Sequence, residues 1–98
     1  MARVATIEAL GGPENIQFHD IELPAPTAGQ ALVRHTAIGL NFIDTYHRRG
    51  IYPVNLPAQL GVEAVGVIEA VGEGVTDLVV GQRVGHFGPE RGAYASHR

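Results

Sequence analysis

The chain has 98 residues, no cysteine and a formal net charge of −3, from seven basic and ten acidic side chains. This length holds one modest core and leaves no room for a two-domain enzyme. The composition excludes a disulfide framework and a thiolate metal site, and the charge balance argues against nucleic acid as a partner. No apolar run approaches the about 20 residues of a membrane span. We therefore expect a small cytoplasmic protein that binds neither nucleic acid nor membranes.

The first third of the chain is predicted to form short strands joined by turns. Apolar and β-branched residues predict strands at 4–10 and 16–21, and the Gly-Gly-Pro run at 11–13 between them is compatible only with a turn. The proline-rich residues 23–29 predict an extended connection. Residues 31–39 follow as a third strand, although their alternation does not decide which face is buried.

One short helix is predicted, at residues 41–49. Asn41 has the side chain of an N-cap, Asp44 lies in the first turn beside the positive end of the helix dipole, and Gly50 follows two arginines as the terminating residue.

The rest of the chain again predicts strands. Residues 51–60 contain two prolines and are interpreted as an irregular loop. Residues 62–71 form the longest strand, which is apolar enough to be covered on both faces for part of its length. Residues 81–85 begin another strand, and residues 93–97 begin one more that stops in mid-pattern. This pattern predicts a mainly β protein, a partly closed β-barrel with one or two short helices, and indicates a piece of a longer chain.

Two familiar site motifs are absent. The histidines have no metal-ligand spacing and no cysteine to complete a set, so we predict no metal site; they lie at positions 19, 35, 47, 86 and 97. Gly72 and Gly74 follow a strand in a G-x-G pattern, but a third glycine and a helix are missing. We interpret this segment as a tight turn between strands, not as a dinucleotide fingerprint.

Glu63 is a carboxylate within an otherwise apolar strand. A buried carboxylate has to be paired or hydrogen-bonded, because burying it alone costs several kcal/mol. Arg83 is one candidate partner, and we favour a structural over a catalytic role for Glu63.

Polar and aromatic groups concentrate on residues 39–53. A capped turn carrying an amide, a carboxylate and two phenols beside a rigid barrel is a typical place for a binding surface. The alternative is that Asn41 and Asp44 only cap the helix while Tyr46 and Tyr52 fill its underside.

The sequence resembles those of the zinc-free quinone oxidoreductases, a zeta-crystallin-like branch of the medium-chain dehydrogenase/reductase superfamily. The resemblance is carried by AIGLNFIDTY at 37–46, RGIYP at 49–53, LGVEAVG at 60–66 and GQRV at 81–84. The Gly-Pro-Glu run at 12–14 also matches, and the similarity covers essentially the whole chain.

The resemblance implies a fold and a division into domains. It implies that residues 1–98 are the N-terminal, GroES-like, substrate-side domain of a longer protein, whose Rossmann domain is absent from this chain. Zinc-dependent relatives carry a cysteine near Asn41 and a histidine at Val62, so the resemblance also implies that no metal is bound.

The resemblance further implies a site between the two domains, with NADPH as cofactor and a quinone as substrate. The nicotinamide end of NADPH is expected against Phe42, Ile43, Asp44, Thr45 and Tyr46. The quinone pocket is expected to be bordered by Asn41, Tyr46 and Tyr52. No catalytic residue is implied.

The activity implied is transfer of reducing equivalents from NADPH to a quinone without a metal, by a homodimeric full-length protein. The enone reductases of the same superfamily are an alternative, and so is a stand-alone binding or interaction module without catalysis. Because the cofactor domain is expected elsewhere, we predict that the 98-residue chain alone is inactive.

Overall fold

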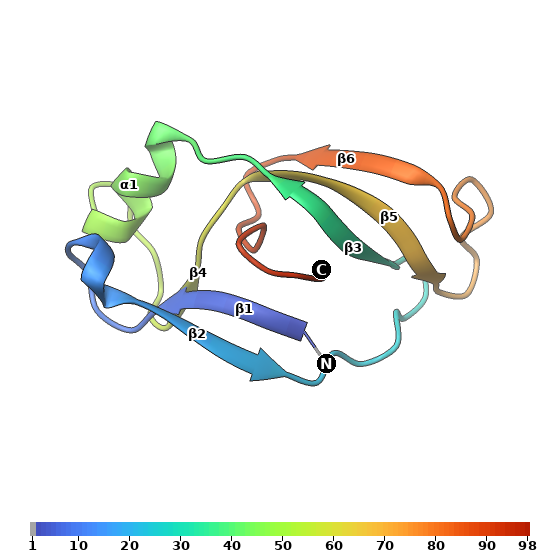
Figure 1. Cartoon of the computed structure of the whole chain (residues 1–98), viewed down its shortest axis with the longest axis horizontal. Coiled ribbons are helices and arrows are strands. Elements are labelled where there is room, and N and C mark those ends of the chain that lie inside the picture. The colour runs from blue at the N-terminus through green and yellow to red at the C-terminus, as the bar shows by residue number, and fades with distance from the viewer. Residues whose placement is uncertain (1) are drawn as a thin grey trace.

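Two antiparallel sheets of three strands each form the framework of residues 2–98, the part of the chain that this computed structural model describes (Figure 1). The first sheet has the order β2-β1-β4. Its strands are β1 (Ala2–Ile7), β2 (Ile16–Ile21) and β4 (Ala58–Gln59). The second sheet has the order β3-β5-β6. Its strands are β3 (Ala31–Ile38), β5 (Glu63–Val71) and β6 (Arg83–Phe87).

The C-terminal segment lies between the two sheets and joins them (Figure 1). Ala95 forms an isolated antiparallel bridge with Val4 of β1, and His97 forms one with Arg34 of β3. The predicted beginning of a strand at 93–97 is thus a pair of single bridges. Because this segment hydrogen-bonds to one sheet and then to the other, it converts two open sheets into the predicted partly closed, mainly β barrel.

The core lies between the sheets, where the largest fully buried side chains are Ile7, Leu60 and Ile68. Along β5, Ile68 is buried while Val65 and Glu69 on the opposite face are exposed. The prediction that this strand is covered on both faces for part of its length is not met, because no side chain on its outer face is fully buried. Only one face of β5 packs against the other sheet, so the strand contains more apolar residues than it buries.

Two predicted segments differ in the structure. β1 begins at Ala2 and ends at Ile7, because the chain turns early into a short 3-10 helix, η1 (Pro13–Asn15). The loop predicted at 51–60 contains β4, whose two residues pair with Thr6 and Ile7 of β1. Local sequence carries no signal for a strand this short, since its hydrogen-bond partners lie about fifty positions earlier.

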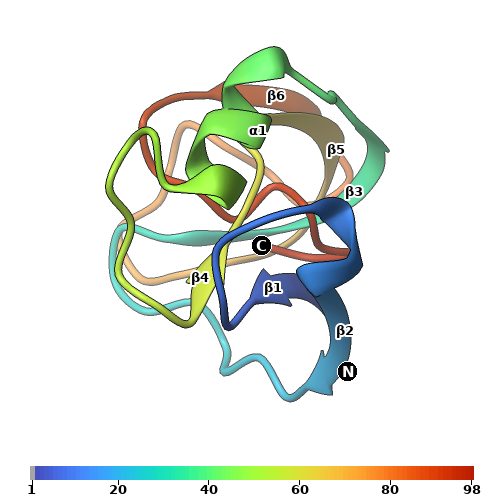
Figure 2. The same ribbon diagram turned by 90° about the vertical axis from the view of Figure 1, so that its left-hand side faces the viewer.

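The helix α1 (Phe42–Arg49) lies at one end of the molecule, beyond the two sheets (Figures 1 and 2). It ends at Gly50, whose φ of 82° is left-handed and suits glycine. Its last turn is fastened to the turn after β1: Arg48 Nε donates to the carbonyl of Gly11 at 3.0 Å, and the Gly11 amide donates to the Arg48 carbonyl at 3.0 Å. No helix within residues 2–98 is long and apolar enough to cross a membrane.

Candidate functional site

The first turn of α1 is organised by Asn41 and Asp44. The backbone N–H of Asn41 donates to Oδ2 of Asp44 at 3.0 Å, and the Asp44 N–H donates to the Asn41 carbonyl at 3.0 Å. Asp44 is only 4% exposed. The prediction that these two residues begin the helix is confirmed, and the buried carboxylate is held by the helix end it caps.

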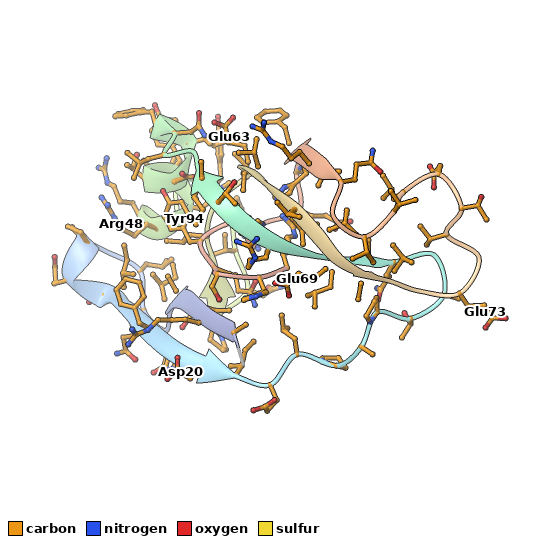
Figure 3. The ribbon with its side chains drawn as sticks, turned by 45° about the vertical axis from the view of Figure 1, so that its right-hand side comes forward. Asp20, Arg48, Glu63, Glu69, Glu73 and Tyr94 are labelled. Atoms are coloured by element: carbon orange, nitrogen blue, oxygen red, sulfur yellow. The ribbon has the colours of Figure 1, made fainter. Side chains whose placement is uncertain are left out.

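Tyr94 is a partner of this site that the sequence did not indicate. Its phenol donates a hydrogen bond of 2.6 Å to Oδ2 of Asp44. Burial, together with the hydrogen bond to Asp44 and the charge of that carboxylate, raises the pKa of Tyr94 well above its usual value. The phenol therefore stays protonated and remains a donor. Figure 3 shows Tyr94 at the end of the molecule that carries Arg48 and α1.

Three of the predicted site residues form a row of aromatic rings. Phe42 and Tyr46 meet edge to face with ring centroids 5.2 Å apart, and Tyr46 and Tyr52 do the same at 5.3 Å. Phe42 is 71% exposed and Tyr52 is 46% exposed. The row is therefore not wholly packed under the helix, because Phe42 and Tyr52 are exposed while Tyr46 between them is half-buried.

Thr45 and Ile43, the two remaining predicted residues of α1, offer no free polar group to a ligand. The hydroxyl of Thr45 donates to the carbonyl of Phe42 at 2.6 Å, so it is satisfied within the helix. Ile43 is half-buried and carries no polar side chain. Within α1 they contribute shape more than hydrogen bonding.

One face of the helix carries buried polar atoms without a hydrogen-bond partner among residues 2–98. They are Nδ2 of Asn41, Oδ1 of Asp44 and Nδ1 of His47, at a spacing of three residues that places them along one side of α1. Buried polar groups are nearly always paired, so these positions are unusual. Burial and the positive charge of Arg91 lower the pKa of His47, against the opposing effect of the Asp44 carboxylate. His47 also touches the aromatic row, with its ring 6.0 Å from that of Tyr52.

Glu63 does not form the predicted ion pair with Arg83. In the register of the second sheet, Glu63 lies opposite Phe87, whereas Arg83 lies opposite Val67 at the far end of β6. Glu63 is half-buried, and its side chain packs so closely over Gly39 that a Cβ there would overlap the carboxylate. The carboxylate thus escapes the cost of full burial by its place at the start of β5.

The five histidines lie in five different segments: β2, β3, α1, β6 and the C-terminal segment. Within the described residues, no three side chains of His, Asp or Glu gather where they could hold a metal ion. His35 and His86 meet, with Nε2 atoms 3.0 Å apart, while His35 Nδ1 lies 2.8 Å from the Ala95 carbonyl. Residues 72–74 form a turn after β5 without a following helix, so the tight-turn interpretation is confirmed.

Two sheets joined by a returning C-terminal segment, with a capped helix at one end, are the features of a GroES-like barrel. The family model "Alcohol dehydrogenase GroES-like domain" matches residues 27–97. The chain belongs to this family, and its strong relatives are quinone oxidoreductases of the medium-chain dehydrogenase/reductase superfamily, as the resemblance predicted.

Three relatives illustrate the match. A quinone oxidoreductase of Pseudomonas aeruginosa is 46% identical over 97% of this chain, and a 2-haloacrylate reductase of a Burkholderia species is 45% identical over 100% of it. A solved structure of the Escherichia coli quinone oxidoreductase complexed with NADPH superposes with a TM-score of 0.93, at 39% identity over 98% of this chain.

The chain spans only part of each relative. It covers 30% of the Pseudomonas protein, 31% of the Burkholderia protein and 30% of the Escherichia coli chain. The match in each case is to the N-terminal part.

Proposed function

We propose that residues 1–98 are the substrate-side domain of a longer NADPH-dependent quinone oxidoreductase, with the cofactor domain outside this sequence. The observation that carries the proposal is the half-exposed aromatic row Phe42–Tyr46–Tyr52 beside the start of α1. The similarity to quinone oxidoreductases, and to one solved with NADPH, supports it. Reduction without a metal, a homodimer and a cytoplasmic location belong to the same proposal.

The residues of α1 suit one side of a nicotinamide ring. Phe42 offers a flat exposed surface, and Asn41 lies next to it as the N-cap of the helix. We assign Phe42, Ile43, Asp44, Thr45 and Tyr46 to the nicotinamide end. The 98 residues contain no phosphate-binding loop, so the remainder of the cofactor has to be held by another domain.

The substrate would be held by side chains that combine a flat face with a polar tip. We assign Asn41, Tyr46 and Tyr52 to the quinone pocket, because a planar acceptor packs against tyrosine rings while phenol and amide donors reach its oxygens. When bound, NADPH supplies a hydride, which with one proton reduces the quinone to a hydroquinone. The protein's contribution is to orient the acceptor and to stabilise charge as it develops on the quinone oxygen.

Reduction of an activated alkene is the second candidate. The similarity to 2-haloacrylate reductase is as high as that to the quinone oxidoreductases and covers the whole chain. The same donors would then face a carboxylate or ketone conjugated to the alkene. Which acceptor is used depends on the opposite wall of the pocket, which these residues do not supply.

Consumption of NADPH tests both candidates. The 98-residue chain and the longer product of the same reading frame are assayed with 1,4-benzoquinone, with an α,β-unsaturated ketone and with 2-chloroacrylate. We expect turnover of the quinone by the longer product only. Preferential turnover of an alkene would select the second candidate.

The same assay addresses the stand-alone binding module. If the longer product reduces none of the three acceptors while the 98-residue chain elutes as a single well-behaved species, the enzymatic proposal fails. A sheet that needs further chain to cover its edges would instead associate or precipitate.

A further inference from the structure

α1 is tied to the rest of the molecule in different ways at its two ends. At its C-terminal end, the Arg48 side chain and two backbone groups fasten it to Gly11. At its N-terminal end, within residues 2–98, the bond from Tyr94 to Asp44 is the only side-chain hydrogen bond that joins residues 41–47 to any residue beyond α1 and its cap. Backbone bonds hold the chain on either side, from the Gly39 N–H to the Glu63 carbonyl and from the Tyr52 N–H to the Tyr46 carbonyl. Tyr94 therefore supplies the one side-chain hydrogen bond that holds the first turn from outside within residues 2–98.

We propose that Tyr94 is a positioning residue for the substrate side of α1, an inference that rests on the proposed function. Its phenol fixes Oδ2 of Asp44, and the same oxygen accepts the backbone N–H of Asn41 at 3.0 Å. Tyr94 thereby sets where Asn41 begins the helix. Asn41 and the aromatic row that follows it are the groups assigned to the ligand.

Tyr94 is itself held firmly enough for this role. Its backbone N–H donates to the Leu60 carbonyl at 3.0 Å, and its carbonyl accepts the Ala5 N–H at 2.8 Å. Its ring packs against the core cluster that contains Ile7 and Leu60. The ring also lies directly over Gly61, where an added Cβ would stand 2.5 Å from Cδ1 of Tyr94. Tyr94 thus connects the core to the helix through a side chain that is fixed by packing.

The chemistry of the bond suits a fixed position. A charge-assisted O–H···O⁻ hydrogen bond is shorter and about twice as strong as a neutral one, and the 2.6 Å distance lies in the range of such bonds. Because Asp44 is buried, water does not compete for Oδ2. The Asn41 N–H and the Tyr94 phenol share this oxygen, so losing one hydrogen bond weakens the other. Small displacements of a group that orients the acceptor lower the rate strongly.

Tyr94→Phe in the longer product of the reading frame tests the proposal, with Ser96→Ala as the matched control. Ser96 lies in the same segment, and its hydroxyl accepts the Arg3 N–H at 2.9 Å without reaching α1. We expect Tyr94→Phe to lower kcat/KM for the quinone about tenfold, the scale of one lost hydrogen bond, while KM for NADPH changes less than about twofold. Ser96→Ala should leave both parameters unchanged.

Amide hydrogen exchange at Asn41 provides a readout that does not depend on activity. Tyr94→Phe should accelerate it about tenfold, because the N–H loses the fixed acceptor, and Ser96→Ala should not. Asp44→Asn, which keeps the shape but weakens both bonds, should act in the same direction and serves if Tyr94→Phe does not fold.

The outcomes distinguish the positioning role of Tyr94 from the proposed quinone reduction. Unchanged exchange at Asn41 in Tyr94→Phe overturns the positioning role, whatever the activity. A loss of thermal stability with unchanged kcat/KM for the quinone overturns it too, since the role would then be structural only. If the wild-type protein does not turn over quinone, the proposed function fails, and faster exchange at Asn41 would still establish that Tyr94 holds the start of α1.

Discussion

The phenol of Tyr94 and the carboxylate of Asp44 are joined by a hydrogen bond of 2.6 Å across 50 positions of sequence. It connects the C-terminal segment, which lies between the two sheets, to the first turn of the helix at the end of the barrel. Asp44 thus accepts a hydrogen bond from the backbone at the start of its own helix and another from a distant segment. We therefore expect it to affect both the stability of the protein and the geometry of the proposed site.

Asp44→Ala should destabilise the protein by about 2–4 kcal/mol. The substitution removes an N-terminal capping group, worth about 1 kcal/mol, and leaves the Tyr94 phenol without an acceptor, which costs about 1–3 kcal/mol. Urea unfolding measures the change, and Asp77→Ala in an exposed turn is the control. Equal stability of the two variants would show that the buried carboxylate contributes nothing.

Tyr52→Ala in the longer product should impair quinone turnover more than NADPH binding. Tyr52 is 46% exposed and contacts Tyr46 edge to face, so its loss removes one end of the proposed pocket wall. Aromatic packing of this kind contributes about 0.5–1.5 kcal/mol, so kcat/KM for the quinone should fall about two- to twelvefold. Titration of NADPH fluorescence measures cofactor binding separately, and an equal loss of both would contradict the assignment.

Gly66→Ala should cost about 1–3 kcal/mol, because it overpacks the middle of β5. An added Cβ would overlap the backbone carbonyl of Arg34 and stand 2.8 Å from Cγ1 of Val33, and β3 cannot move away without losing its pairing. Gly88→Ala is the matched control, since a Cβ there meets nothing within 4 Å, and it should change stability by less than about 0.5 kcal/mol. Denaturant midpoints for the two variants should differ clearly; coincident midpoints would argue against the close approach.

Stability should decrease as the pH falls from about 7.5 to about 5.5. Burial, with the charges of Arg98 and His35, lowers the pKa of His86 from its ordinary value of 6.5. The unfolded chain then binds more protons than the folded one at pH values below about 6.5, so the contribution is complete above that value and is lost on acidification. His47 acts in the same direction.

His86→Asn should show a smaller loss over the same pH interval, measured by urea unfolding. Gln17→Ala on β2, which removes no titratable group, is the control and should retain the wild-type pH dependence. An identical loss in wild type and His86→Asn would exclude His86 as a source of the effect.

Most strands, the α-helix α1 and its cap were predictable because they depend on local chemistry. Asn41 and Gly50 act on the backbone groups beside them, and the strands follow from β-branched runs interrupted by glycine and proline. The aromatic residues of the candidate site were also predictable, since Phe42, Tyr46 and Tyr52 lie within eleven positions of each other.

The predictions that failed concern pairing between segments that are distant in the sequence. The strand β4 exists only because β1 is beside it, and Glu63 misses Arg83 because the register of β5 against β6 places another residue opposite it. Register is decided by which faces are buried in three dimensions, and a single sequence does not specify it for every strand.

The sequence alone thus determined most of the strands, the capped helix and the aromatic residues along it. Tertiary structure alone decided that Tyr94 reaches Asp44, that the segment around Ala95 closes the barrel and that only one face of β5 is covered. The physical reason is that caps and turns are satisfied by groups a few residues away. A buried carboxylate or a strand edge, in contrast, takes its partner from whichever distant segment the folded core brings within hydrogen-bond distance.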